Sequence, residues 1–152
     1  MALLCCDLPF SRFVFSVQAE VADRMLANEG SRDFGPLSIV LQSTCSLEKL
    51  FHLPPQVFWP APEVDSVVLR LDINRANFAS PDDLRAFGEF VRAAFGHRRK
   101  TLNYNLSRTV DPPVLRSLGE SLEIDLRQRP EQIPVRKWLE MYFRLNLKSR
   151  ES

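Results

Sequence analysis

Two aromatic side chains stand directly before two prolines in the stretch Phe58-Trp59-Pro60-Ala61-Pro62. Proline cannot continue a helix or donate to a sheet ladder, and it pushes the residue before it toward extended backbone, so this stretch is a stiff loop. Alternation from Val64 to Leu71 predicts that a strand follows. Rings held at the mouth of a strand favour a pocket for a flat group. The alternative is that both rings pack in the core.

A second feature is the basic run His97-Arg98-Arg99-Lys100, which precedes a short predicted helix. Residues 1–83 hold 6 Lys and Arg against 11 Asp and Glu, whereas residues 84–152 hold 14 against 8. The first part is therefore acidic and the second basic, which indicates a polyanionic partner for the second part. Ordinary solvated helix faces that carry excess arginine are the alternative reading.

The composition is that of a globular protein. Of 152 residues, 45% are apolar and 26% are charged, which argues against disorder and fits one compact domain or slightly more. No apolar run approaches the roughly 20 residues of a membrane span. Three cysteines without a C-x-x-C spacing indicate neither a disulfide framework nor a zinc site, so a reduced, cytoplasmic protein is expected.

The first half reads as alternating strands and helices. Phe13–Val17 predicts a buried strand, residues 19–27 a helix, and residues 37–41 a short helix that leads into a strand at 45–50. A strand that feeds a helix almost without a loop is typical of an α/β layer.

The second half reads as helices. Ser80 and Pro81 have the N-cap and first-turn character of a helix start, and apolar residues follow at 3.6-residue spacing as far as Gly96. Further helices are predicted after Asp111-Pro112 and after Pro134.

Four stretches in order resemble one family, the small-subunit rRNA adenine N6,N6-dimethyltransferases, which are themselves similar to the erythromycin-resistance rRNA methyltransferases. The matching stretches are residues 17–24, 34–39, 58–71 and 95–102. The resemblance covers roughly residues 10–145. It implies an enzyme that uses S-adenosylmethionine (SAM) to methylate adenines, and a helical part that engages rRNA.

The resemblance also implies roles for individual residues. Phe58 matches the position of an aromatic ring beside the flipped-out target adenine, and stacking there returns on the order of 1–3 kcal/mol. Trp59 is expected to be structural. Arg98, Arg99 and Lys100 match a basic motif expected to contact phosphates. The chain departs from the family at Ala19 and Glu63, where lysine is usual, and Glu63 places an acid beside the expected base pocket.

The SAM-binding features are missing from the sequence. A site of this type needs a Gly-rich turn after the first strand, and the chain has no G-x-G. Asp7-Leu8-Pro9-Phe10 is the nearest look-alike of the family's catalytic motif, but only Ser11 and Arg12 separate it from the next strand. A helical crossover cannot fit there. We therefore expect this chain to contain no catalytic, cofactor-binding or metal-binding residues.

The expected fold class is α/β plus all-α. Residues 1–75 would be a C-terminal remnant of a Rossmann-like methyltransferase domain, and residues 76–152 a small helical rRNA-binding domain. The expected function is that of a C-terminal fragment of an rRNA adenine dimethyltransferase, inactive alone.

Two alternatives stay open. One is a non-catalytic rRNA-binding or ribosome-assembly module. The other is one half of a split enzyme that is completed by a missing N-terminal half. The expected partner in each case is small-subunit rRNA or a pre-ribosomal particle, with no membrane involved.

Overall fold

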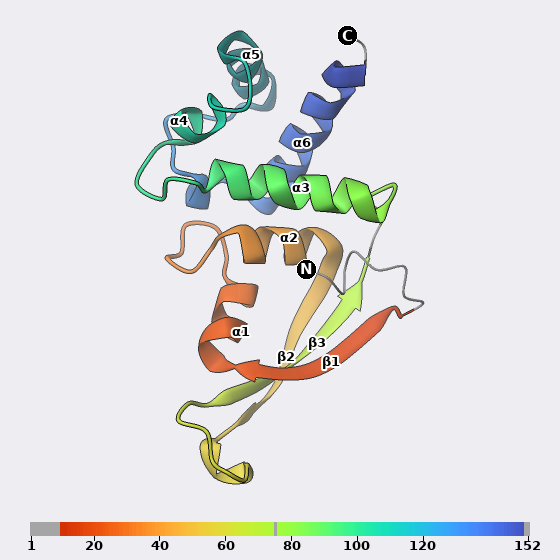
Figure 1. Ribbon diagram of the computed structural model, residues 1–152, viewed down its shortest axis with the longest axis vertical. Helices are drawn as coiled ribbons and strands as arrows, with labels where there is room; N and C mark the ends of the chain where they lie inside the picture. The colour runs from red at the N-terminus through yellow and green to blue at the C-terminus, as the bar shows by residue number, and fades with distance from the viewer. Residues whose placement is uncertain (1–9, 75, 151–152) are drawn as a thin grey trace.

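The computed structural model describes residues 10–74 and 76–150, with side chains as far as residue 146 (Figure 1). Residues 1–9 lie outside the described part, and with them most of the predicted loop Asp7–Phe10. The elements in chain order are β1 (Arg12–Gln18), α1 (Ala19–Leu26), α2 (Pro36–Thr44), β2 (Cys45–Leu53), the 3₁₀ turn η2 (Pro55–Val57), β3 (Ser66–Ile73), α3 (Pro81–Ala94), α4 (Leu102–Leu106), α5 (Pro112–Leu122), the 3₁₀ turn η3 (Pro130–Gln132) and α6 (Val135–Arg150).

The three strands form one sheet in the order β1-β3-β2, and both strand pairs are antiparallel. Phe15 and Lys49 lie opposite Leu69 on its two sides, and the β2–β3 register shifts between Lys49 and Phe51. The connection from β2 to β3 projects beyond the rest of the molecule, at the bottom of Figure 1.

The predicted fold class is wrong. A Rossmann-like sheet consists mainly of parallel strands joined by helical crossovers, whereas this sheet has three strands and only antiparallel pairs among the described residues. The alternating pattern located the strands correctly, but a pattern of side-chain faces carries no information about the direction in which strands pair. The strands at 13–17, 45–50 and 64–71 were therefore placed in the wrong kind of sheet.

One face of the sheet is covered by helices. Val67, Leu69 and Leu71 of β3 are buried on the face where α1 and α2 pack, in a cluster with Met25 and Ile39. The opposite face carries exposed and half-buried polar residues, among them the ion-paired Arg12, Glu48, Arg70 and Asp72. This in-and-out alternation is what an antiparallel sheet with one solvated face shows.

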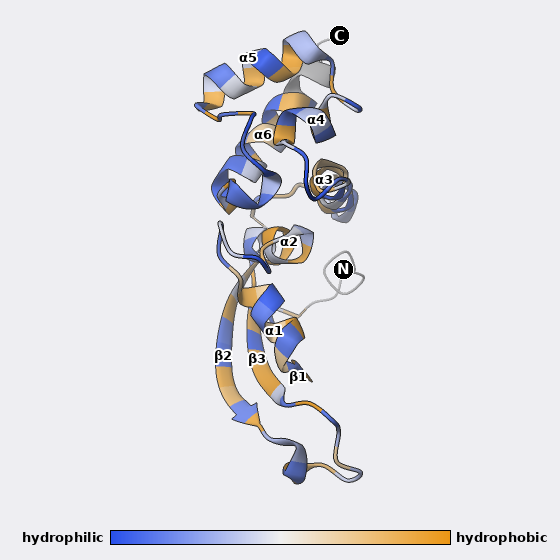
Figure 2. Ribbon diagram, turned by 90° about the vertical axis from the view of Figure 1, so that its left-hand side faces the viewer, coloured by the Kyte–Doolittle hydropathy of each residue, from blue (hydrophilic) through white to orange (hydrophobic). Residues whose placement is uncertain are grey.

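The predicted helix starts of the second half are confirmed. Ser80 caps α3, since its Oγ accepts a hydrogen bond from the Asp83 amide at 3.2 Å. The buried Trp138 of α6 donates from Nε1 to the Ile133 carbonyl at 3.0 Å. The helices stack above the sheet, so the molecule is elongated (Figure 2).

The buried apolar residues of both halves belong to one cluster, which runs from Ala22 to Tyr142. Helix α2 packs against both α3 and α6 and so joins the sheet to the helices. The division into residues 1–75 and 76–152 stays a prediction. No helix in the described part of the chain is both long and apolar enough to cross a membrane.

Candidate nucleic-acid interface

The basic run lies on the short loop between α3 and α4. Arg98, Arg99 and Lys100 are all exposed there. Thr101 ends the loop and begins α4, because its Oγ1 accepts a hydrogen bond from the Tyr104 amide at 3.2 Å. The cationic side chains therefore leave a loop whose end is fixed by a helix cap.

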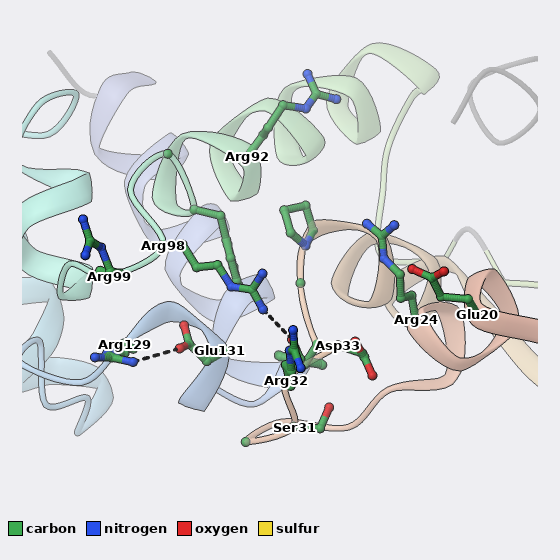
Figure 3. Close-up of a pocket in the computed structure, with 16 residues that line it drawn as sticks. Glu20, Arg24, Ser31, Arg32, Asp33, Arg92, Arg98, Arg99, Arg129 and Glu131 are labelled. Carbon is green, nitrogen blue, oxygen red and sulfur yellow. Dashed lines mark hydrogen bonds and ion pairs between the residues drawn. The ribbon is translucent and has the colours of Figure 1, made fainter.

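A hollow of ≈ 1130 Å³ opens beside this loop (Figure 3). Its walls come from α1, the loop before α2, the end of α3, the basic loop and the segment around η3. Six arginines line it against three acids. The arginines are Arg24, Arg32, Arg92, Arg98, Arg99 and Arg129, and the acids are Glu20, Asp33 and Glu131.

Among the described residues, few of these arginines form an ion pair. Arg98 donates from Nη2 to the Arg32 carbonyl at 2.9 Å, which ties the basic loop to the loop before α2. Arg129 lies 3.9 Å from Glu131. In the part of the chain that the structure describes, the side chains of Arg24, Arg92 and Arg99 form no ion pair.

Planar guanidinium groups in a shared hollow suit phosphate groups. Arginine presents a fork of donors that matches phosphate oxygens two at a time and keeps its charge at all working pH values. An arginine without an acidic partner brings its full charge to such a contact. The hollow can therefore hold several phosphates of one polyanion.

Lys100 does not line the hollow. Its Nζ lies 5.3 Å from the centre of the Tyr104 ring, and that ring meets the His97 ring edge-on at 5.4 Å. The structure thus brings Arg98 and Arg99 into one site and places Lys100 beside it.

Phe58 lies far from the basic run, on the β2–β3 connection that projects from the far end of the sheet (Figure 1). Its ring is half-buried, and its amide donates to the Pro55 carbonyl at 3.1 Å. Trp59 is 98% exposed, so the expectation that it is structural is wrong. The exposed Glu63 lies on the same connection.

The residues of the hollow do not fit SAM. The cofactor carries a positive sulfonium and a positive ammonium, and a site of this kind holds its ribose with an acid and approaches it with Gly-rich backbone. The hollow has an excess of arginine, and the chain has no G-x-G.

Four of the hollow's arginines were missed from the sequence: Arg24, Arg32, Arg92 and Arg129. Arg24 ends a stretch that resembles the family, but no role was assigned to it, and the other three are not part of a basic run. Only the packing of α1 and the loop before α2 beside α3 brings them together. The excess of positive charge in residues 84–152 predicted a polyanionic partner but did not predict which residues would form the binding site.

Comparison with known proteins identifies relatives. The family model for "Ribosomal RNA adenine dimethylase" matches residues 4–147. The small-subunit rRNA methyltransferase A of Xanthomonas oryzae pv. oryzae is 39% identical over 127 residues, which are 84% of this chain and 47% of that protein. Its counterpart from Legionella pneumophila is 38% identical and is covered to 48%. The chain thus spans about half the length of the curated relatives it matches.

Solved structures show the same fold. A dimethyladenosine transferase from Plasmodium falciparum matches with a TM-score of 0.84 at 23% identity, over 97% of this chain and 61% of that one. The 23S rRNA methyltransferase ErmE matches with a TM-score of 0.62 at 18% identity, over 93% of this chain and 58% of that one. The family and fold matches extend over nearly the whole chain, and the expectation that the chain is a C-terminal portion stays a prediction.

Proposed function

Since the chain belongs to the ribosomal RNA adenine dimethylase family, we propose that it takes part in SAM-dependent methylation of adenines in small-subunit rRNA. Its own contribution is to bind the RNA backbone in the arginine-lined hollow. The expected partner is small-subunit rRNA or a pre-ribosomal particle. A cytoplasmic location stays a prediction.

The observation that supports this proposal most is the set of unpaired arginines. Arg92 of α3 and Arg99 of the basic loop line one hollow without a carboxylate partner among the described residues. Neutralising phosphates releases counterions from RNA, so such contacts make binding depend steeply on salt. They fix the position of the RNA without reading its sequence.

The test compares two double variants of equal charge. Arg92→Gln with Arg99→Gln removes two cations from the hollow, whereas Arg85→Gln with Arg116→Gln removes two exposed arginines that do not line it. Binding of a fluorescent rRNA hairpin is followed by anisotropy at several salt concentrations. In the first pair, the negative slope of log K against log salt should become shallower by about 1–2, as expected for two lost phosphate contacts.

The control pair should leave this slope close to that of the wild type. Equal slopes for both double variants would contradict the hollow as the RNA site. The triple variant Arg98→Ala, Arg99→Ala and Lys100→Ala should weaken binding further than either pair, and an unchanged affinity in that variant would count against RNA binding by the basic loop.

We propose that Phe58 supports the target base. A stiff, projecting loop loses little entropy when a base lies on its ring, and a base removed from its stack regains about 1–3 kcal/mol on an aromatic face. An RNA with 2-aminopurine at the target adenine should be quenched by the wild type and by Phe58→Tyr. Phe58→Ala should abolish the quenching, and Val57→Ala, a change of an exposed neighbour, should not.

We propose that these 152 residues alone bind no SAM and transfer no methyl group. The support is the absence of G-x-G from the sequence and the cationic character of the hollow. Stoichiometric heat on titration with SAM would overturn this. A radiolabelled methyl-transfer assay on small-subunit particles, with and without a second chain that carries a Gly-rich SAM motif, distinguishes a split enzyme from a binding module.

The binding module is the second candidate function. It is favoured by a hollow that offers cations for phosphates but no cradle for a cofactor. Binding to small-subunit particles without methyl transfer under both conditions would favour it.

A further inference from the structure

Asn105 is a buried polar residue next to the basic loop. It lies in α4 with 2% of its surface exposed. A buried amide side chain costs free energy unless both its oxygen and its nitrogen find partners. The partners of Asn105 all lie at the two ends of the loop that carries Arg98, Arg99 and Lys100.

The side-chain amide of Asn105 forms hydrogen bonds with both the backbone N–H and the backbone carbonyl of His97. Oδ1 of Asn105 accepts from the His97 amide at 2.9 Å, and Nδ2 donates to the His97 carbonyl at 3.3 Å. Nδ2 also donates to the Thr101 carbonyl at 3.1 Å. The His97 amide is a donor and the two carbonyls are acceptors, so this pattern fixes which end of the Asn105 amide is oxygen.

These three bonds close the loop at residues 97 and 101. The loop is tightened from inside as well, because the Lys100 amide donates to the His97 carbonyl at 2.9 Å. At the start of the loop the chain passes close to α3, since a Cβ on Gly96 would lie 3.2 Å from the Ala93 carbonyl oxygen. The positions from which the cationic side chains leave are thereby set before any ligand binds.

We infer that Asn105 is a positioning residue for RNA binding, which holds the basic loop so that Arg98 and Arg99 point into the hollow. This inference rests on the proposed function. A loop that is already ordered loses less entropy when it binds, so affinity rises without any contact from the positioning residue itself. Asn105 is buried and needs no contact with the RNA.

The test is a double-mutant cycle between Asn105→Ala and the triple variant of Arg98, Arg99 and Lys100 to alanine. RNA binding is measured for the wild type, each variant and the combination. Asn105→Ala alone should weaken binding about tenfold. In the Asn105→Ala variant, the triple alanine change should weaken RNA binding much less than it does in the wild type. The reason is that the three cationic side chains of an unanchored loop already contribute less to binding.

A merely structural role would give a different result. If Asn105 only stabilised the fold, the two losses would add, and additivity overturns the inference. Asn103→Ala is the matched control, since Asn103 is exposed on the same helix and makes no side-chain hydrogen bond within the described residues. It should leave binding within twofold of the wild type.

A second variant and a second measurement cover the case in which Asn105→Ala does not fold. Asn105→Asp keeps the acceptor for the His97 amide but loses both donors, and it should show the same non-additivity. In the wild type, the His97 amide should exchange its hydrogen as slowly as amides of α3. Fast exchange there overturns the inference directly.

The outcomes also separate this inference from the proposed function. No effect of the triple variant in the wild-type background would contradict RNA binding by the loop. A large effect of the triple variant that is undiminished in the Asn105→Ala background would contradict only the positioning role.

Discussion

Asp72 has the most heavily paired carboxylate on the solvated face of the sheet. It accepts from Arg12 of β1 and, at 3.1 Å, from Nε of Arg70 on its own strand. The hydrogen bond from Arg12 lowers the pKa of Asp72 below its ordinary value of 3.8, and the positive charges of Arg12 and Arg70 lower this pKa further. A carboxyl group with a lowered pKa stabilises the folded state at pH values above its unfolded pKa, and this stabilisation disappears as the pH falls through the folded pKa.

Arg12→Gln should therefore raise the Asp72 pKa toward 3.8, as measured by a carboxyl ¹³C titration. The variant should be less stable than the wild type at neutral pH, and the difference should vanish in acid below the folded pKa of Asp72. Arg85→Gln, which breaks an exposed ion pair with Asp82 on α3, serves as the control and should leave the pKa of Asp72 unchanged. A pKa that stays low without Arg12 would refute the assignment of the shift to that hydrogen bond.

Tyr142 links α6 to the start of α3 through a nearly buried hydroxyl group. Its oxygen lies 2.7 Å from Asp83 Oδ1 and 2.9 Å from the Asp83 carbonyl oxygen, and these two acceptors share one proton. Tyr142→Phe keeps the ring in its place against Phe87 and removes only the donor. Loss of a bond to a charged acceptor should lower the free energy of unfolding by about 1.5–3 kcal/mol.

Urea unfolding measures this change. Tyr104→Phe is the matched control, because the Tyr104 ring is 42% exposed and its hydroxyl makes no hydrogen bond within the described residues. A Tyr142→Phe variant as stable as the wild type would mean that water replaces the bond without cost.

At the scale of elements, local chemistry predicted where helices begin better than how strands pair. Ser80 and Pro81 predicted the start of α3, and Pro134 predicted the start of α6, because caps and fixed φ angles act over a few residues. The antiparallel sheet was missed, since pairing direction depends on contacts between distant strands. Trp59 was misplaced for a similar reason: a ring on a projecting loop has the same sequence signature as a ring in the core.

Gly119 shows how closely an element can be fitted to its neighbours. It lies buried in α5, where an added Cβ would come within 3.0 Å of Leu126 Cγ and 3.2 Å of the Ile124 carbonyl oxygen. Alanine is better than glycine inside a helix by about 1 kcal/mol. Overpacking against backbone costs about 1–3 kcal/mol and should outweigh that gain.

Gly119→Ala should therefore lower the free energy of unfolding by about 1 kcal/mol net, as measured by urea titration. The same experiment on Ser117→Ala, an exposed position of the same helix, should show no loss. A Gly119→Ala variant more stable than the wild type would mean that Leu126 moves aside without cost.

At the scale of the molecule, the candidate site could be predicted only in part. Arg98 and Arg99 were found because they are neighbours in the sequence and match a family motif. The other arginines of the hollow come from α1, the loop before α2, α3 and the segment before η3, and only tertiary packing brings them together. Phe58 and the basic loop are both predicted to bind RNA, yet the β2–β3 connection and the α3–α4 loop lie far apart along an elongated molecule (Figure 1). A single RNA that contacts both must therefore extend along the molecule.

The shared core also sets how the molecule unfolds. Ile39 of α2 and Trp138 of α6 are both fully buried in the same cluster, and α2 packs against α6. We expect a single cooperative transition, in which the sheet and the helices lose their structure together. Ile39→Ala should lower the free energy of unfolding by about 2–4 kcal/mol, because it leaves a cavity in this core.

A Trp59→Phe background makes Trp138 the only tryptophan, so that its fluorescence reports on α6 while far-UV circular dichroism reports on the whole chain. Ile39→Ala should move both urea midpoints by the same amount, although the changed residue lies in the first half of the chain. Val14→Ala, at a position that is 56% exposed, is the control and should shift both midpoints only slightly. Two separate transitions, with the Trp138 signal unmoved by Ile39→Ala, would instead show that residues 1–75 and 76–152 unfold as independent domains.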